Sequence, residues 1–237
     1  MQTIDNLGFR HLWHRGVVRA GDVLLFDYSG CSGMRLTARV IRSVQRRLLR
    51  DLGAAEDARL EEHRFSHAAI ASGCGAILEM TTPAARVNLA GLVPDGVRVM
   101  VRRPRHEGED IPEEIAAAIV DAAWRDVSAG RRYPTGELLT YWLWSWGVNK
   151  LMLGKKFVEV FTSDRADVCS GSVWRWCIEA GLFRDSEPSD LRPEAWYPAR
   201  LAADNGNRFR TVGVWKLTEA TADAGPDMLR MEPSGVC

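Results

Sequence analysis

Short apolar segments separated by turns occupy the first half of this sequence, and they restrict the chain to a fold built on a sheet. Residues 65–71 and 76–81 are two such segments, and Ser72-Gly73-Cys74-Gly75 between them has the length of a hairpin turn. Further segments of this kind lie at 21–26, 87–92 and 97–101. The segment at 21–26 is interpreted as the first core strand. Because consecutive short strands usually pair with their neighbours, we expect the central portion, residues 65–101, to form an antiparallel meander.

Helical patterns dominate the second half of the sequence. Pro112 stands where a helix commonly begins, and Gly130 where one commonly ends. A second helix is predicted to run from about residue 169 to Gly181, because apolar residues recur along one side of it, namely Val173, Trp174, Cys177 and Ile178. Strands followed by helices predict an α+β fold, in which an antiparallel sheet packs against helices.

The length of 237 residues suits one well-buried core. With no internal repeat and no low-complexity linker, residues 1–237 are interpreted as a single domain. We expect its core to span about 20–217, and we interpret 218–237 as a loose tail because that stretch has little pattern.

Charge and cysteine content narrow the class of protein. Lys plus Arg and Asp plus Glu both number 31, so the net charge gives no reason to expect a nucleic-acid partner. The five cysteines include no CxxC pair and no zinc-like spacing, which favours a reducing compartment without a disulfide framework. We therefore expect no metal and no organic cofactor.

The start of the chain and its longest apolar stretches bear on location. Residues 1–22 lack the continuous apolar core of a secretory signal. No stretch reaches the roughly 18 apolar residues of a membrane span. We expect a cytoplasmic location or export by a route that needs no amino-terminal signal.

Cys169 is the strongest candidate nucleophile. It lies at the start of the predicted helix, where unpaired backbone N–H groups and the helix dipole stabilise an anion, so the pKa of its thiol should fall. The same N–H groups, including that of Ser170, suit an oxyanion hole. The rival cysteines Cys31 and Cys74 lie in glycine-rich turns and do not begin an apolar helix.

A cysteine nucleophile needs an imidazole base and a group that orients it. His67 lies in one strand of the predicted hairpin and Glu79 in the other, so their side chains approach if the turn is Ser72–Gly75. A carboxylate inside an apolar strand is costly without a partner, and His67 is the obvious one. We expect the cysteine helix to pack on the sheet face that carries this pair. A strand histidine taken alone more often has only a structural role.

Several other residues are weaker candidates. Tyr28, Tyr133 and Trp142 are candidates for an oxyanion donor or a groove wall, without spacing that supports them. Trp142 belongs to an aromatic cluster at 141–146, typical of a core or groove and also found at membrane interfaces. A metal site made from His63, His67 and Cys74 matches no zinc pattern.

Four motifs, taken in order, resemble those of a known family. They are Gly21-Asp22-Val23-Leu24-Leu25-Phe26, Phe65-Ser66-His67-Ala68-Ala69-Ile70, Ile77-Leu78-Glu79-Met80 and Val168-Cys169-Ser170-Gly171-Ser172-Val173. The set is similar to the circularly permuted NlpC-type papain-like proteins, which include the YiiX-like hydrolases and the lecithin:retinol acyltransferase group. In that family a Gly-Asp strand opens the domain, a strand histidine and a polar residue follow, and the nucleophilic cysteine heads a helix near the carboxyl end.

The resemblance implies a permuted papain-like domain with Cys169 as nucleophile, His67 as base and Glu79 as the group that orients the base. Glu79 resembles the YiiX-like pattern, whereas Ser170-Gly171 departs from the Ser-Glu often found after the cysteine there. The function expected is hydrolysis of an amide in a peptide, peptidoglycan or lipid-linked substrate, through a thioacyl intermediate and with transient membrane contact. Two alternatives stay open: a lipid acyl hydrolase or acyltransferase with the same triad, and an inactive binding module or a delivered toxin domain with a cognate inhibitor protein.

Overall fold

A computed structural model describes residues 1–31, 38–39, 41–42, 45, 64–81, 84–132, 169–183, 198–204 and 208–218. The described residues form a mixed α/β structure with an eight-stranded sheet and four α-helices, so the expectation of sheet plus helices is confirmed. The strands are β1 (Gln2–Asp5), β2 (Val23–Asp27), β3 (His67–Ala71), β4 (Ala76–Met80), β5 (Ala85–Leu89), β6 (Arg98–His106), β7 (Glu109–Asp110) and β8 (Phe209–Thr218). The helices are α1 (Asn6–His14), α4 (Glu113–Ser128), α8 (Cys169–Glu179) and α9 (Pro198–Ala203).

The sheet has the strand order β1-β8-β6-β2-β3-β4-β5, with β7 paired to β6. The predicted hairpin is confirmed, since β3 and β4 pair antiparallel around Gly73–Gly75. The predicted meander is confirmed from β3 to β5 and wrong for the next strand, because β6 crosses back and pairs with β2. The sheet is also not purely antiparallel, since β1 runs parallel to β8.

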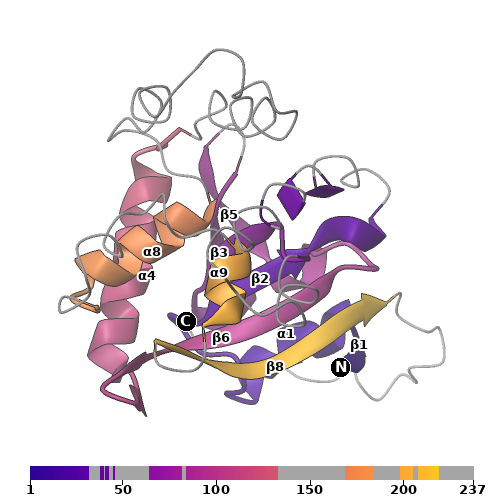
Figure 1. The fold of residues 1–237 in the computed structure, drawn as a ribbon, viewed down its shortest axis with the longest axis horizontal. Helices are drawn as coiled ribbons and strands as arrows, with labels where there is room; N and C mark the ends of the chain where they lie inside the picture. The colour runs from indigo at the N-terminus through magenta and orange to yellow at the C-terminus, as the bar shows by residue number, and fades with distance from the viewer. Residues whose placement is uncertain are drawn as a thin grey trace.

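Apolar side chains cover both faces of the central strands, which makes a structure of three layers. On one face Leu25, Ala68 and Ile70 pack against α4 and α8. On the other face Leu24 and Phe26 pack against α1. Because both faces are covered, every residue of β2 is buried. Figure 1 shows α4 and α8 crossing each other on one side of the sheet and α1 on the other side.

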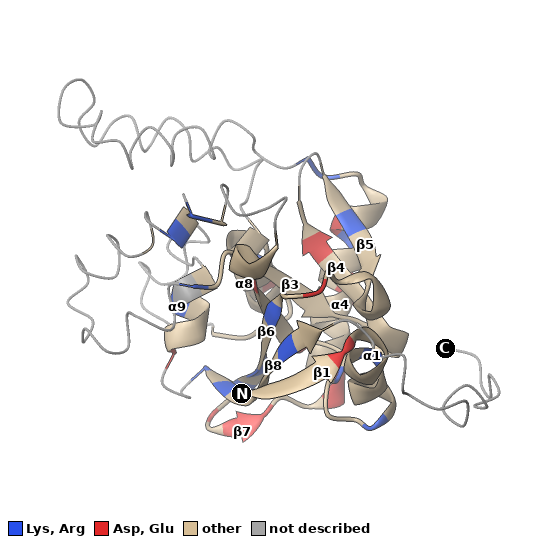
Figure 2. Ribbon diagram, turned by 90° about the vertical axis from the view of Figure 1, so that its right-hand side faces the viewer, with Lys and Arg blue, Asp and Glu red and all other residues tan. Residues whose placement is uncertain are grey.

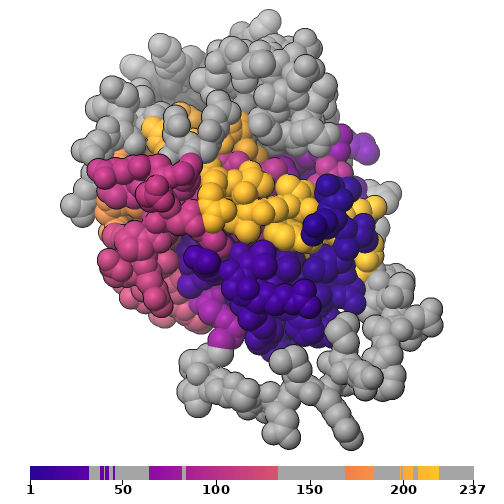
Figure 3. Space-filling model, turned by 90° about the horizontal axis from the view of Figure 1, so that it is seen from below, coloured from indigo at the N-terminus to yellow at the C-terminus, as the bar shows by residue number. Residues whose placement is uncertain are grey.

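The packed core begins before residue 20, where the sequence predicted its start. Phe9 and Leu12 of α1 are buried, and β1 pairs with β8 in the register Gln2↔Trp215. Seen from below, the amino-terminal residues lie directly against β8 (Figure 3). Strand β1 thus gains its hydrogen bonds from a strand at the other end of the described chain, a pairing that local sequence patterns do not reveal.

The Gly21-Asp22 turn connects the first core strand to the rest of the fold. Gly21 has φ +82°, and a Cβ there would lie 3.0 Å from Cα of Ala116 in α4. Both facts favour glycine. Asp22 is buried and accepts hydrogen bonds from Nε and Nη2 of Arg103 in β6, each at 2.8 Å. This short motif therefore fixes α4 and β6 relative to β2.

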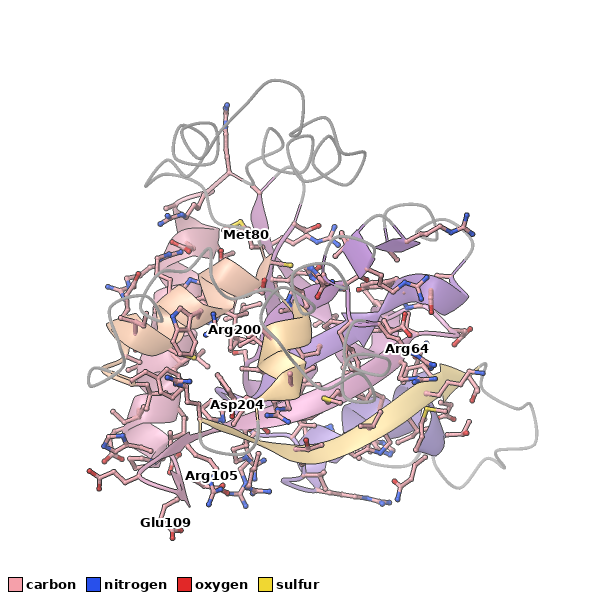
Figure 4. All side chains as sticks on the ribbon, in the orientation of Figure 1. Arg64, Met80, Arg105, Glu109, Arg200 and Asp204 are labelled. Carbon is pink, nitrogen blue, oxygen red and sulfur yellow. The ribbon has the colours of Figure 1, made fainter. Side chains whose placement is uncertain are left out.

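Helix α9 is held against the sheet by a second buried arginine. Nη2 of Arg102 donates to the backbone carbonyls of Asp204 and Phe209, at 2.5 and 2.9 Å. Oδ2 of Asp204 in turn accepts from the backbone N–H of Arg208 and of Phe209. Figure 4 shows Asp204 at the end of α9, beside β6. These bonds close the connection between α9 and β8.

Lys and Arg positions and Asp and Glu positions both occur in several described elements, in keeping with the balanced composition (Figure 2). None of the helices in the described ranges has the length and hydropathy needed to span a bilayer. The predicted tail at 218–237 begins one residue too early, because Thr218 is the last residue of β8. The rest of that tail, 219–237, and the aromatic cluster at 141–146 lie outside the described residues.

Candidate active site

Cys169 is the first residue of α8, as the sequence predicted, and its side chain is 5% exposed. The helix is held in place by Val173, Trp174 and Cys177, which are buried against the sheet. Trp176 adds a polar contact, because its Nε1 donates to Asp126 of α4 at 2.8 Å. The amino end of α8 is therefore supported along most of the helix behind it.

His67 is the first residue of β3 and pairs in register with Phe26 of β2. Its ring lies against two aromatic rings, with centroid distances of 5.8 Å to Phe26 and 6.2 Å to Tyr28. The side chain is 14% exposed. The imidazole is thus largely shielded from water and restricted in rotation.

Glu79 lies on β4, where its side chain is 2% exposed. Its cross-strand partner is Ala69, which places His67 on the diagonal of the same sheet face. Nε2 of His67 and Oε2 of Glu79 are 2.8 Å apart. The structure therefore brings together the two hairpin residues that the sequence singled out.

The Cys169 sulfur is hydrogen-bonded to the His67 ring and also receives the backbone N–H groups of Ala68 and Ser170. Since Nε2 of the ring is engaged with Glu79, Nδ1 is the nitrogen left for the sulfur. Cys169, His67 and Glu79 thus form one continuous chain of hydrogen bonds.

The expected placement of the cysteine helix is wrong in one respect. Helix α8 packs on the face that carries Ala68 and Ile70. Side chains alternate along a strand, so His67 belongs to the opposite face with Ala69. The sulfur still reaches the imidazole because Cys169 begins its helix and His67 begins its strand. The site therefore lies at the end of β3.

The electrostatics of Cys169 and His67 are mutually reinforcing. Burial on its own raises the pKa of the Cys169 thiol, but the charge and hydrogen bond of His67 and the two backbone N–H groups lower it overall. Burial likewise lowers the pKa of His67, but the Cys169 sulfur and then Glu79 outweigh it and raise the pKa to about 10. Opposite shifts of this kind favour a thiolate–imidazolium pair.

Glu79 keeps its negative charge despite burial. Burial raises the pKa of the carboxyl, but the hydrogen bonds and charges of His67 and Arg86 lower it to about 2. An ionised carboxylate that accepts from Nε2–H fixes the orientation of the imidazole and stabilises its charged form.

Among the weaker candidates, Tyr28 and Ser170 lie at the site. The Tyr28 hydroxyl is within electrostatic range of Glu79 and Cys169, and burial with the Glu79 charge raises its pKa, so it stays a hydrogen-bond donor. Ser170 contributes its backbone N–H to the sulfur, while its hydroxyl is buried without a partner among the described residues. Tyr133 and Trp142 lie outside the described residues.

The other described cysteines have different surroundings. Burial raises the pKa of the Cys177 thiol to about 12, as expected for a cysteine that packs in the core. Cys31 donates to the carbonyl of Asp95 at 3.3 Å. Cys74 is disulfide-bonded, which departs from the expectation of a chain without disulfides.

Sequence reasoning missed Arg86, which donates from Nε to Oε1 of Glu79 at 2.8 Å. Asn88 approaches the same oxygen at 3.4 Å. The signal that predicts them is the pairing of β4 with β5, because Arg86 lies directly across from Glu79. A buried carboxylate on a central strand has neighbours on both flanking strands, and for Glu79 these are β3 and β5.

Within the described ranges, no group of three or more His, Cys, Asp or Glu side chains is arranged to hold a metal ion. Comparison of the chain with protein-family models, with curated proteins and with solved structures gives no match.

Proposed function

We propose that this protein is a cysteine hydrolase that cleaves an amide bond through a Cys169–His67–Glu79 triad and a thioacyl intermediate. The observation that supports this most strongly is the continuous hydrogen-bond chain from the buried Glu79 carboxylate, through the His67 ring, to a sulfur at a helix amino terminus. A hydrogen-bond network that served only to stabilise the fold would not require a thiol whose pKa is lowered.

The chemistry follows from the positions of these groups. The Cys169 thiolate attacks the substrate carbonyl, and the oxyanion that forms accepts hydrogen bonds from backbone N–H groups near the start of α8 and from the Tyr28 hydroxyl. The tetrahedral intermediate collapses to a thioester as the imidazolium of His67 gives its proton to the departing amine. Water then attacks the thioester and yields a proton to His67, the carboxylic acid leaves, and the thiolate–imidazolium pair is restored.

The proposed fold family is the permuted papain-like, NlpC-type domain. Its support is the order of parts along the chain: the Gly21-Asp22 strand, the strand histidine, the strand carboxylate and last the cysteine helix. The three catalytic candidates meet in space in spite of their wide separation in sequence. Peptides and peptidoglycan peptides, free or lipid-linked, are the substrates we propose for this site.

Turnover assays on the full chain test the proposal. Murein peptides and phospholipid vesicles should be offered separately to the wild type, to Cys169→Ala and to Cys177→Ala as a matched control. We expect amide cleavage by the wild type and the Cys177 variant, and a loss of at least about 1,000-fold in kcat/KM for the Cys169 variant. Release of fatty acid instead of amine assigns the site to the acyl-hydrolase alternative. Cleavage that survives Cys169→Ala contradicts the triad.

A further inference from the structure

The Glu79 carboxylate is held from two sides by two neighbouring strands. Oε2 faces His67 on β3, and Oε1 faces Arg86 on β5, each at 2.8 Å. Figure 2 shows the same arrangement at the level of the strands, with an acidic position on β4 beside a basic position on β5. The two contacts use different oxygens, so together they determine the rotation of the carboxylate.

The two residues of the Arg86–Glu79 pair have very different exposure. The Glu79 side chain is 2% exposed and the Arg86 side chain 58% exposed. The guanidinium therefore keeps most of its hydration while its Nε–H serves a buried oxygen, so the pair avoids the desolvation of two buried charges. An exposed arginine paired only for surface stability would contribute little. Here its partner is the carboxylate that contacts the candidate base.

The charges at the site also balance only when Arg86 is included. The Cys169 thiolate and the Glu79 carboxylate are negative, and the imidazolium of His67 supplies one positive charge. The Arg86 guanidinium supplies the second, through a contact with Glu79 and not with the sulfur. Without it, a buried carboxylate would depend on the imidazolium alone.

We propose that Arg86 is a positioning residue. It holds the Glu79 carboxylate in the orientation in which the other carboxylate oxygen accepts a hydrogen bond from Nε2–H of His67. The inference rests on the proposed function, because it assigns Arg86 a role in the chemistry that acts through Glu79. Arg86 touches neither the sulfur nor the imidazole in the described contacts. Loss of Arg86 should change the ionisation of the site as well as its geometry.

The direction of that change follows from the contacts. Loss of the Arg86 charge and hydrogen bond raises the pKa of Glu79, which both of them lower. Glu79 then takes up a proton at a higher pH than in the wild type, and His67 loses its anionic partner at that pH. The imidazolium, and with it the Cys169 thiolate, is less stable there, so the acid limb of thiol reactivity moves to higher pH.

The test compares Arg86→Ala, Arg86→Lys and a matched control, Arg210→Gln, with the wild type. Arg210 on β8 pairs with Asp110 on β7 at 2.5 Å, so its loss removes a partly exposed ion pair that involves neither Glu79 nor α8. The measurements are the pH dependence of Cys169 alkylation by iodoacetamide, kcat/KM on the amide substrate, and rescue of Arg86→Ala by added ethylguanidinium.

We expect Arg86→Ala to lose about 10- to 100-fold in kcat/KM, as small misplacements of catalytic groups do, and to shift the acid limb of alkylation upward. Ethylguanidinium should restore part of both, Arg86→Lys should lie between wild type and Arg86→Ala, and the control should match the wild type. If the folded Arg86→Ala variant keeps the wild-type acid limb, Arg86 is only a structural residue of β5. Alkylation needs no substrate, so this result is distinguishable from failure of the proposed function, in which the wild type itself would lack a reactive Cys169.

Discussion

At Cys169 three hydrogen-bond donors converge on one sulfur: the His67 ring and the backbone N–H groups of Ala68 and Ser170. Donors of this kind stabilise the thiolate and not the thiol, which offsets the cost of burying a charge. Cys177, two turns further along the same helix, is buried without such donors, and the pKa of its thiol rises. The contrast between two buried cysteines of one helix shows that the surroundings of the sulfur, and not burial alone, set the direction in which the thiol pKa moves.

Glu79 makes the stability of the fold depend on pH in the acid range. Its pKa is lowered from 4.5 to about 2 in the folded chain, so the ionised carboxylate stabilises the fold above about pH 4.5, and that contribution is lost as the pH falls toward 2. The upper bound on the contribution is about 3 kcal/mol. We expect the unfolding free energies of wild type and Glu79→Gln, from urea titrations, to converge by up to this amount between pH 5 and pH 2. Glu114→Gln, which changes an exposed residue, should show no such convergence, and a pH-independent gap for Glu79→Gln would contradict the shift.

At the scale of elements, the position of the sulfur depends on how α8 is attached to α4. Asp126 of α4 accepts from Nε1 of Trp176 and from the Arg175 guanidinium, and it lies 3.6 Å from Arg131. Trp176 is fully buried. The contact therefore supplies a polar partner that the core around Trp176 does not otherwise provide.

Removal of this partner should weaken the fold and loosen α8. Asp126→Ala leaves a buried indole N–H without its acceptor, for which we expect a loss of about 2–4 kcal/mol in unfolding free energy. Asp121→Ala, on the exposed side of the same helix, should change it by less than about 0.5 kcal/mol. Urea denaturation of both variants measures the difference. Equal stability of the two variants would show that Asp126 is not the anchor of α8.

The elements that the sequence predicted are those with local signals. The hairpin of β3 and β4 followed from two apolar runs and a short turn, and α8 from an apolar stripe that ends before Gly181. Together these placed His67, Glu79 and Cys169 as candidates. Two features that sequence reasoning missed depend on pairing between distant segments, namely the return of β6 to β2 and the parallel pair of β1 and β8. Arg86 has a local explanation: the strand predicted at 87–92 begins at Ala85, and this brings Arg86 into register with Glu79. Because side chains alternate along β3, His67 and α8 also lie on opposite faces of the sheet. The Cys169 sulfur reaches the imidazole because each of the two residues is the first of its element.

For the whole molecule, the Asp22–Arg103 pair joins the turn before β2 to β6. Side chains of both residues are less than a tenth exposed, and Asp22 also accepts from the backbone N–H of Arg19. Breakage of a buried pair leaves an uncompensated charge and commonly costs about 3–5 kcal/mol. The Gly21-Asp22 motif thus has a structural explanation that is separate from the chemistry of the site.

Asp22→Ala should consequently reduce the stability of the entire fold without changing the reactive thiol of the molecules that remain folded. We expect a loss of about 3–5 kcal/mol in the urea-derived unfolding free energy. Arg210→Ala breaks a more exposed pair with Asp110 and should cost about 1 kcal/mol or less. A loss for Asp22→Ala no larger than that of Arg210→Ala would show that the Asp22–Arg103 pair does not hold the sheet together.

The central claim is that Cys169 is a thiolate nucleophile maintained by His67. The most direct measurement is the rate of iodoacetamide labelling from pH 4 to pH 10, with the labelled cysteine identified by mass spectrometry, in wild type and in His67→Ala. We predict labelling of Cys169 in the wild type well below the ordinary thiol pKa of 9.0, and a return toward that value in His67→Ala, whose circular dichroism should remain that of the folded protein. Labelling of Cys31 in preference to Cys169, or an unchanged profile in folded His67→Ala, would contradict the account.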